Sequence, residues 1–274
     1  MSFFPVALKE LTDARRNRWL QSLSLVFFVL ALGVAYFGGA VAGRVGFTGL
    51  SNTVVSLASL GVFIIPLIAL MLSYDCIVGE EDDGTLLLLR SYPISLWQLF
   101  LGKWLGRSAL LLVCLLLGFG SAGLLIALNI EEDISVVLSA FSVFILSSFL
   151  LGIVYIGLGI AISALASSRN QAAGIALLLW FISCILFDII LLAVLVASEG
   201  KVASDMLAVS LLLNPTDIFR IINFNLFSDM QVHTGLMAVS GKLALHNYVL
   251  FPVLCLWLVL SALLAYFLVK KRTV

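Results

Sequence analysis

Six apolar stretches, separated by short polar segments, dominate the hydrophobic pattern of this chain. A helix needs about 20 apolar residues to cross the hydrocarbon core of a bilayer, and helices satisfy their own backbone polar groups in lipid. The pattern therefore predicts an all-α polytopic membrane protein with six transmembrane helices, in one transmembrane domain spanning residues 1–274. The predicted spans are Trp19–Ala40, Val54–Val78, Trp104–Leu128, Val136–Leu165, Ala172–Ala197 and Tyr248–Val269.

The segment before the first span, residues 1–18, has apolar residues at helical spacing. Phe4, Leu8 and Leu11 fall on one side of such a helix, while Lys9 and Glu10 fall on the other. This predicts an interfacial amphipathic helix on the membrane surface, with a disordered basic tail as the alternative. The apolar run that follows exceeds the roughly 7–15 residues of a signal-peptide core, so we expect it to be retained as a span.

Composition and charge agree with a membrane protein and exclude nucleic acid as a partner. The chain is 62% hydrophobic and 11% charged, and its formal net charge is zero. Its mean hydropathy is +1.20. Nucleic-acid binding depends on positive charge that neutralises phosphates, and this chain has no excess of it.

The distribution of Lys and Arg predicts the orientation in the membrane. Most of the 15 basic residues lie on one side if the N-terminus is cytoplasmic, and basic loops face the cytoplasm. We therefore expect a bacterial inner-membrane protein with both termini and the loop 79–103 in the cytoplasm. The loop 198–247 is then extracytoplasmic, and its apolar runs Met206–Leu213 and Ile218–Phe227 predict helices within it.

The cytoplasmic loop contains an acidic turn followed by a short apolar segment. Gly84 is expected to end the turn, Thr85 to cap a helix from Leu86, and Pro93 to end that helix. A short helix of this kind can dock in a groove of a soluble protein; the alternative is an ordinary solvated loop. The candidate contact residues of this coupling helix are Glu80, Glu81, Asp82, Gly84, Thr85, Leu86, Leu89, Arg90 and Pro93.

No motif for independent ATP hydrolysis or enzyme catalysis is present. The Gly-Lys pairs at 102–103, 200–201 and 241–242 lack the earlier glycine and the following Ser or Thr of a phosphate-binding loop. We therefore expect a non-catalytic chain that binds no cofactor. Met230, His233, Met237 and His246 have spacings that could hold a soft metal, but packing is the favoured interpretation, and no metal ligands are assigned.

Two acidic residues are candidates for a polar function within the membrane. Asp75 lies near the cytoplasmic end of the second span, and Asp188 lies deep in the fifth. A charged residue at the centre of a span costs about 2.5–3.5 kcal/mol on insertion scales. Asp188 either lines a cavity between two copies or is a paired or protonated structural carboxyl; the spans offer it no obvious basic partner.

The cytoplasmic loop resembles the coupling region of ABC-2 type permeases, and the N-terminal segment is similar to the interfacial helix of that family. A closer resemblance covers essentially the whole chain. It is to the permeases of transporters that mature the copper sites of nitrous oxide reductase. Asp83 departs from the pattern, because a second glycine is expected there, and the turn should be less permissive for positive φ. The matching residues are Glu80, Gly84, Thr85, Leu86, Leu89, Pro93 and Lys103; Lys9-Glu10-Leu11 and Arg16-Asn17-Arg18-Trp19; Tyr74-Asp75, Ile77-Val78-Gly79-Glu80; Ser198-Glu199-Gly200-Lys201; Leu212-Leu213-Asn214-Pro215-Thr216-Asp217-Ile218, Arg220 and Ile222-Asn223.

The resemblance implies partners on both sides of the membrane. It implies a homodimer in the lipid bilayer with a cytoplasmic ABC ATPase subunit on each copy, where ATP and Mg²⁺ are bound. It also implies a periplasmic copper-handling β-helix protein docked on the outer loop. Asn214, Pro215, Thr216, Asp217 and Arg220 would help to shape that docking surface. From the residues alone, the alternative is a helix start at Pro215 with Thr216 or Asp217 as cap and Arg220 paired nearby.

Together these features predict a permease subunit that couples ATP hydrolysis by a separate ATPase to a periplasmic partner in copper-site maturation of nitrous oxide reductase. One alternative keeps the architecture and assigns a lipid or drug exporter. Another is an ATPase-independent proton-linked carrier or channel that uses Asp188.

Overall fold

A computed structural model describes residues 8–10, 12, 18–37, 50–85, 95–129, 133–199, 204–227 and 246–273. Every regular element in these ranges is helical, and no strand occurs among them, so the all-α prediction is confirmed. The helices are α2 (Arg18–Phe37), α3 (Leu50–Ser73), α4 (Val78–Asp82), α6 (Leu96–Leu115), α7 (Ser121–Asn129), α8 (Ile134–Leu165), α9 (Arg169–Phe181), α10 (Phe187–Ala197), α11 (Ser204–Leu212), α12 (Pro215–Phe224) and α14 (Asn247–Thr273).

Three short helical turns complete the list. A π-helical turn, η2 (Leu116–Gly120), joins α6 to α7, and a second one, η3 (Ile182–Leu186), joins α9 to α10. The 3₁₀ turn η4 (Asn225–Phe227) follows α12. The two π-helical turns lie inside long apolar helices. There the backbone hydrogen bonds change from i→i+4 to i→i+5 spacing without ending the span.

Five helical stretches are long and apolar enough to cross a membrane, and they coincide with the second to sixth predicted spans. They are Leu50–Asp82, Leu96–Asn129, Ile134–Leu165, Arg169–Ala197 and Asn247–Arg272. The first predicted span corresponds to α2, a helix of 20 residues, whose described apolar part is Leu25–Phe37. At 1.5 Å per residue, α2 is about 30 Å long, which matches the thickness of the hydrocarbon core.

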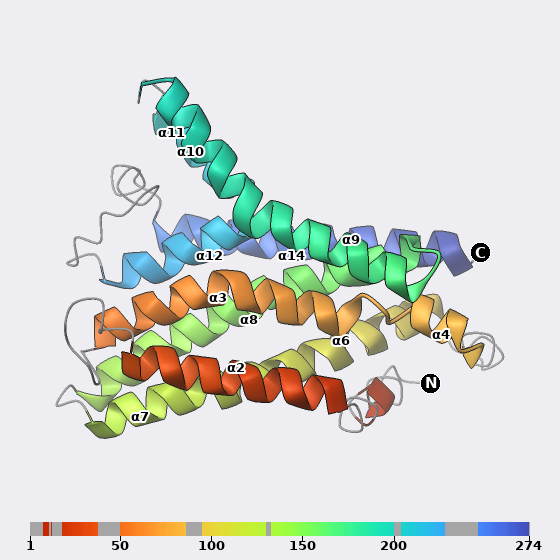
Figure 1. Ribbon diagram of the computed structural model, residues 1–274, viewed down its shortest axis with the longest axis horizontal. Helices are drawn as coiled ribbons and strands as arrows, with labels where there is room; N and C mark the ends of the chain where they lie inside the picture. The colour runs from red at the N-terminus through yellow and green to blue at the C-terminus, as the bar shows by residue number, and fades with distance from the viewer. Residues whose placement is uncertain are drawn as a thin grey trace.

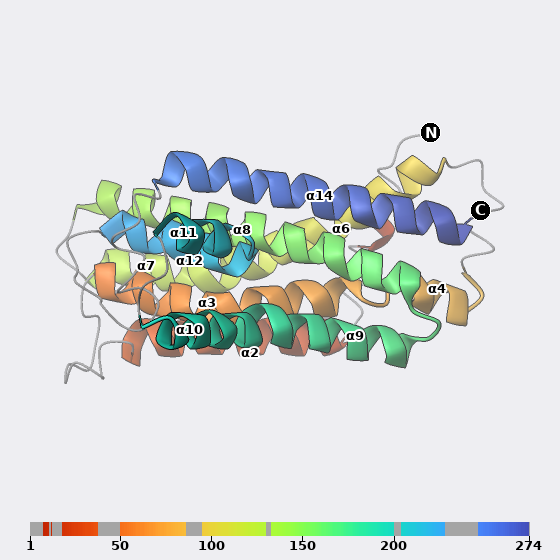
Figure 2. The same ribbon diagram turned by 90° about the horizontal axis from the view of Figure 1, so that it is seen from above.

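Successive spans run in alternating directions along one bundle (Figure 1). Helix α4, the helical residues 8–10 and the last turn of α14 lie at the same end, which we call the α4 end. The end of α7 and the start of α8 lie at the opposite end. Seen from above, α14 and α2 lie at opposite sides of the bundle with α8 between them (Figure 2). Because residues 8–10 and the last turn of α14 lie at the same end, the chain passes along the bundle an even number of times between them.

Helix α8 is the centre of the bundle because it is apolar around its whole circumference, which favours burial on all sides. Small residues bring its neighbours very close. A Cβ atom on Gly159 would lie 2.0 Å from Oγ of Ser73 in α3, and one on Gly157 would lie 2.7 Å from Oγ of Ser261 in α14. Glycine permits such close approach of helices in membranes.

The outer loop folds back into the bundle instead of lying over its end. Helices α11 and α12 are bent by 111° with respect to each other. Ile218, Phe219 and Ile222 of α12 are fully buried, and the ring of Phe219 lies 6.2 Å from that of Phe144 in α8. The sequence correctly predicts helices in this loop, but it does not predict that one of them joins the core.

The fifth predicted span, Arg169–Ala197 in the structure, is the least buried of the five long apolar stretches. Only 11% of its most apolar window is buried, compared with 56% for the second span. Helix α10 leaves the bundle together with α11 (Figure 1), and Ile189, Ile190 and Leu192 are exposed. Such an exposed apolar helix surface requires lipid or another protein surface to cover it.

Candidate functional site

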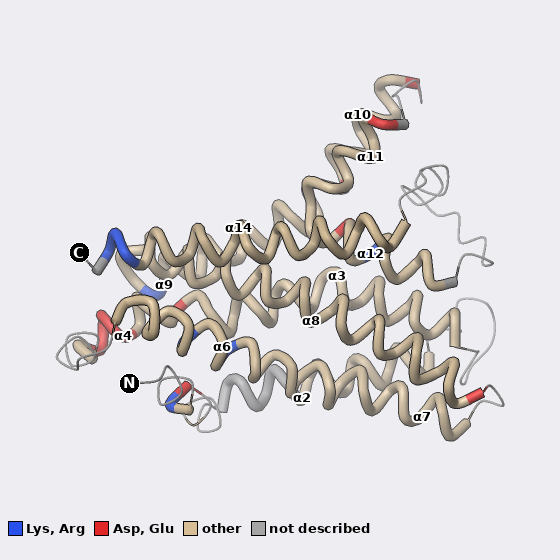
Figure 3. Tube along the Cα trace, turned by 180° about the vertical axis from the view of Figure 1, so that it is seen from behind, with Lys and Arg blue, Asp and Glu red and all other residues tan. Residues whose placement is uncertain are grey.

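Charged residues gather at the α4 end of the bundle (Figure 3). The stretch Glu80–Asp83, which we call the acidic segment, was predicted as a turn. The structure corrects this, because the first three of these residues belong to the short helix α4. The amides of Ile77 and Val78, at the start of α4, donate to Oγ of Ser163 at 2.9 and 3.1 Å. A hydroxyl of α8 therefore fixes where α4 begins.

Glu80 binds two lysines from different parts of the chain. Its carboxylate lies 2.9 Å from Nζ of Lys9 and 2.7 Å from Nζ of Lys103. The ammonium group of Lys103 also lies 3.1 Å from Oε1 of Glu10 and donates to the carbonyl of Cys76 at 3.0 Å. The Lys103 side chain is only 1% exposed. A buried ammonium group is tolerated when all of its protons find acceptors, as they do here.

Arg107, one turn after Lys103 on α6, binds the other oxygen of Glu10. Its Nε lies 3.0 Å from Oε2 of Glu10, and its Nη1 lies 3.2 Å from Asp75. Burial by itself would raise the pKa of Glu10, but the positive charges of Arg107 and Lys103 outweigh burial and hold this pKa below its ordinary value. Asp75, a predicted intramembrane candidate, thus lies at the α4 end as a partner of Arg107.

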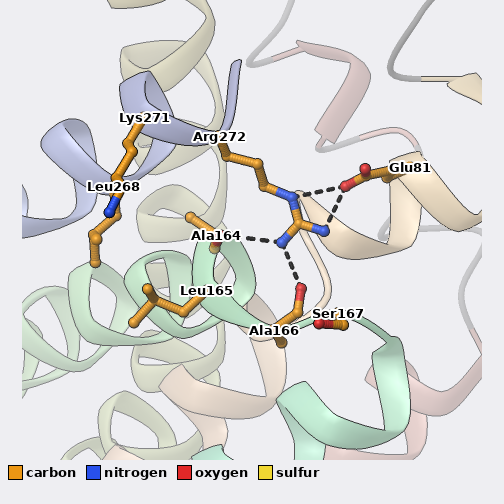
Figure 4. Close-up of a pocket in the computed structure, with 8 residues that line it drawn as sticks. All are labelled: Glu81, Ala164, Leu165, Ala166, Ser167, Leu268, Lys271 and Arg272. Atoms are coloured by element: carbon orange, nitrogen blue, oxygen red, sulfur yellow. Dashed lines mark hydrogen bonds and ion pairs between the residues drawn. The ribbon is translucent and has the colours of Figure 1, made fainter. Parts of the chain in front are cut away.

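Glu81 binds Arg272 in the last turn of α14. Oε2 of Glu81 lies 2.7 Å from Nε and 2.5 Å from Nη2 of Arg272 (Figure 4). Nη1 of Arg272 donates to the carbonyls of Ser163, Ala164 and Ala166 at 2.9, 3.1 and 2.5 Å. These carbonyls lie at the end of α8, where helical donors run out. Arg272 therefore joins α4, α8 and α14 beside a cavity of about 460 Å³.

Asp82 and Asp83 face Arg169 in the first turn of α9. The guanidinium of Arg169 contacts Asp83 closely and lies 3.9 Å from Asp82. It also donates to the carbonyl of Gly79 at 2.7 Å, and a Cβ atom on Gly79 would lie 3.0 Å from Nε of Arg169. All four carboxylates of the acidic segment thus bind cations, and these come from the N-terminal helical residues, α6, α9 and α14.

The glycine missing at position 83 does not disturb the turn after α4. Asp83 has φ of −83°, and the positive φ of 70° falls on Gly84, where glycine adopts it without strain. Thr85 donates from Oγ1 to the carbonyl of Glu80 at 3.2 Å. Leu86, Leu89, Arg90 and Pro93 lie outside the described residues, so the capping by Thr85 and the coupling helix stay predictions.

A second polar cluster surrounds the first turn of α12; we call it the α12 cluster. Oδ1 of Asn214 accepts from the amide of Thr216 at 3.2 Å, and Pro215 occupies the first helical position, where it suits helix starts. Asn214 also donates from Nδ2 to the carbonyl of Ser183 at 2.8 Å. The cap is therefore Asn214, whereas the sequence-based alternative expected Thr216 or Asp217.

The carbonyl of Ser183 belongs to the π-helical turn η3, near the middle of the fifth span. A neighbouring irregularity faces it in α3, where Pro66 has no amide hydrogen for the carbonyl of Val62. Sγ of Cys184 in η3 donates to that carbonyl at 3.4 Å. Irregular backbone at membrane depth persists only where protein partners satisfy it, and α3, η3 and α12 supply such partners to one another.

Arg220 joins α12 to the first turn of α10. Its Nη2 lies 2.7 Å from Oδ2 of Asp188, and its Nη1 lies 3.0 Å from Oδ1 of Asp217. The fifth span thus has a basic partner for Asp188, which the outer loop supplies 32 residues later in the chain. Sequence spacing within the spans does not reveal this pair.

The five residues predicted to help shape a periplasmic docking surface are buried or largely buried in this structure. Asn214 is 3% exposed, Thr216 0% and Asp217 1%. Pro215 is also buried, and the side chain of Arg220 is 14% exposed. In this structure these five residues hold α12 in place, so contact between them and a partner stays a prediction.

No group of three potential metal ligands among His, Cys, Asp and Glu occurs in the part of the chain that the structure describes. Met230, His233 and Met237 lie outside that part, and His246 is the first described residue before α14.

The ion pairs around the acidic segment and Glu10 form what we call the α4 cluster, and sequence reasoning missed its basic half. It used Arg107, Arg169 and Arg272 only to orient the chain, and Lys103 for that purpose and as a matching residue of the coupling region. The signal for two of them was present, because Lys103 and Arg107 are four residues apart and thus share a helix face at the start of an apolar span. Charged residues in such a span need partners.

Three comparisons relate the chain to known proteins. A family model described as "ABC-2 family transporter protein" matches residues 4–274. The chain is 47% identical over 270 residues to the "Probable ABC transporter permease protein NosY" of Pseudomonas aeruginosa, covering 98% of each protein. It is 44% identical over 268 residues to the protein of the same description from Stutzerimonas stutzeri, covering 97% of each.

Proposed function

The chain belongs to the ABC-2 family of transporter proteins, and we propose that it is the permease through which a separate ATPase drives copper-site maturation of nitrous oxide reductase. By family it is a non-catalytic membrane subunit of an ABC transporter, of the NosY type. The ATPase, the periplasmic partner and the maturation role are the proposal. Near-complete coverage of the two NosY relatives supports it.

The observation that carries the ATPase coupling is the set of ion pairs around the acidic segment. Glu80, Glu81 and Asp83 bind cations of α6, α14 and α9, so a displacement of α4 is passed directly to three spans. In the proposal, the ATPase docks on the loop 79–103 on the cytoplasmic side, together with both termini. ATP and Mg²⁺ are bound by that subunit.

The exposed fifth span supports a homodimer. ABC permeases of this family generally act as dimers, and the apolar surface of α9 and α10, including Leu178, Ile189 and Leu192, offers an area for a second copy. Lipid covers the other exposed apolar faces of the bundle. Because α10 carries Asp188, the dimer surface would be in direct connection with the α12 cluster.

The path to the periplasmic partner runs through α12 in this proposal. Arg220 and Asn214 connect α12 to α10 and η3, so movement of the fifth span changes the position of α11 and α12. A copper-handling β-helix protein docked at the periplasmic end would respond to that change. Asn214, Pro215, Thr216, Asp217 and Arg220 would set the orientation of the docking elements from inside the bundle.

The test is a deletion of this gene in a bacterium that carries it, followed by purification of its nitrous oxide reductase. The proposal expects a reductase deficient in copper, restored by the wild-type gene. It also expects a tagged permease to recover an ABC ATPase and a periplasmic copper-handling protein. A fully copper-loaded reductase in the deletion strain would overturn the maturation role. Recovery of the ATPase without any periplasmic protein would favour a lipid or drug exporter.

A further inference from the structure

The α12 cluster contains more negative than positive charge. Asp188 and Asp217 each place one oxygen on Arg220, at 2.7 and 3.0 Å. One guanidinium carries a single positive charge, so it neutralises only one of the two carboxylates. If both were ionised, the cluster would keep a net charge of −1 inside the protein.

The remaining carboxylate oxygens have no donor among the described residues: the amide of Asn214 lies beside Asp217 but donates to the carbonyl of Ser183. Oδ1 of Asp188 and Oδ2 of Asp217 are buried without a hydrogen-bond partner among the described residues. Asp217 is 1% exposed, and its carboxyl group lies within hydrogen-bond reach of Asp188. A buried polar atom without a partner costs about 1–3 kcal/mol, and more when it is charged. Two neighbouring carboxyl groups therefore each keep a buried oxygen without a donor.

Among the residues that the structure describes, the surrounding elements offer no second positive charge. Besides Asp188 on α10 and Arg220 on α12, the titratable groups facing Asp217 are Cys184 in η3 and Tyr155 in α8. Both of these are neutral when protonated. A metal ion would need more ligands than this cluster provides, and no group of three His, Cys, Asp or Glu side chains occurs in the described part.

We propose that Asp188 and Asp217 form a proton-binding site, which holds one proton between the two carboxyl groups at neutral pH. Two carboxyl groups at one site retain a proton, because like charges in close contact cannot both ionise. The shared proton gives one carboxyl group a hydrogen and makes the other its acceptor. It also reduces the charge of the cluster to zero.

The site joins two elements that are far apart in the chain. Asp188 belongs to the first turn of α10, which leaves the bundle, while Asp217 and Arg220 belong to α12, which lies within it. Separating α10 from α12 would remove the reason for sharing a proton, and the proton would be released. Whether the proton is bound therefore depends on the contact between α10 and α12. This dependence holds whether or not the proposed maturation role is correct.

Infrared spectroscopy of the purified full-length chain in lipid nanodiscs tests the proposal. A protonated carboxyl absorbs separately from a carboxylate, so a shared proton gives a protonated-carboxyl band at neutral pH. We expect this band in the wild type and its loss in both Asp188→Asn and Asp217→Asn. Asp205→Asn, which changes an exposed acid of α11, is the matched control and should keep the band.

Arg220→Gln gives the opposite result and separates a proton site from an ordinary ion pair. Without the guanidinium, the two carboxyl groups bind protons more strongly, so the band should persist or grow. A wild type without the band, or a band unchanged in both Asp→Asn variants, would overturn the proposal. Abolition of the wild-type band by added Na⁺ or Cu⁺, with stabilisation of the protein, would also overturn it and identify a cation site.

Discussion

The two polar clusters of this protein differ in how their charges are balanced. In the α4 cluster, every carboxylate of the acidic segment lies against a cation, and these cations come from several elements. In the α12 cluster, two carboxylates share one arginine, and two buried oxygens have no donor. The balanced cluster is suited to transmitting a displacement, while the unbalanced one is sensitive to protons and to the separation of its helices.

The two clusters also differ in their exposure to water. The α4 cluster lies at an end of the bundle, where the side chains of Glu81 and Asp83 are 51% and 60% exposed. The α12 cluster lies beside the middle of the fifth span, and Asp217 is 1% exposed. Water screens an unpaired charge at the exposed part of the α4 cluster, but it does not screen one at the buried α12 cluster. Even within the α4 cluster, Lys103 and Glu10 are as buried as the α12 residues.

Replacing that buried lysine should have the largest effect. Lys103→Met leaves Glu10 and Glu80 without their shared cation, and removal of one partner from a buried pair costs about 3–5 kcal/mol. We expect a large drop in the midpoint of thermal unfolding, measured in detergent. Adding Glu10→Gln to this variant should restore part of the loss. An unchanged midpoint in Lys103→Met would mean that this pair is not buried in the folded protein.

At the other cluster, Asn214→Ala should have an intermediate effect. It removes the cap of α12 and its bond to the carbonyl of Ser183, and the loss of a cap costs about 0.5–2 kcal/mol. Asn214→Ser is the matched control, because its hydroxyl keeps the capping acceptor. Thermal unfolding and hydrogen exchange of the α12 amides measure the effect. Equal exchange in the two variants would contradict a role for the cap.

Acid should loosen the α4 cluster through Glu10. Its pKa is held below the ordinary value in the folded state. Its carboxylate therefore stabilises the protein above the ordinary carboxyl pKa, and this stabilisation is lost as the pH falls through the lowered pKa. The difference in unfolding midpoint between the wild type and Glu10→Gln should thus disappear at acid pH. A difference independent of pH would show that packing, and not charge, anchors Glu10.

The smallest effect on stability among these variants is expected at the half-exposed pair of Glu81 and Arg272. Glu81→Gln breaks the ion pair with Arg272, but Glu81 is half-exposed, and such surface pairs contribute about 0–1 kcal/mol. Its effect should appear in coupling, as weaker stimulation of the partner ATPase by the permease. The charge exchange Glu81→Arg with Arg272→Glu should restore coupling if the pair transmits force. Normal ATPase stimulation in Glu81→Gln would remove this pair from the pathway.

Much of the architecture follows from the sequence, since a bilayer permits few solutions. Apolar length alone located the spans, because a chain in lipid must satisfy its backbone as helices. The matches at α8 and α14 are within a few residues of the predicted bounds. The start of α12 was also legible, because proline favours the first position of a helix. Its cap, Asn214, was recognised only as part of the matching block.

Long-range partners were not predictable in the same way. The sequence left Asp188 without a partner within its span, and the partner Arg220 lies on a helix that folds back into the bundle. The family resemblance assigned the Asn214–Asp217 block to a docking surface, and it did not reveal that these side chains are buried. Whether α12 is buried depends on how Ile218, Phe219 and Ile222 pack against other helices. The sequence of this one segment does not reveal those contacts.

The sequence by itself determined that this chain crosses the membrane as helices, carries an acidic cytoplasmic segment in its predicted orientation, and resembles a driven permease. Those properties reside in local composition and in matching motifs. Only the tertiary structure decided that Glu80–Asp83 joins α6, α9 and α14, and that Asp188 and Asp217 share Arg220. Charge balance is a property of the space around a side chain, and that space is built from residues far apart in the chain.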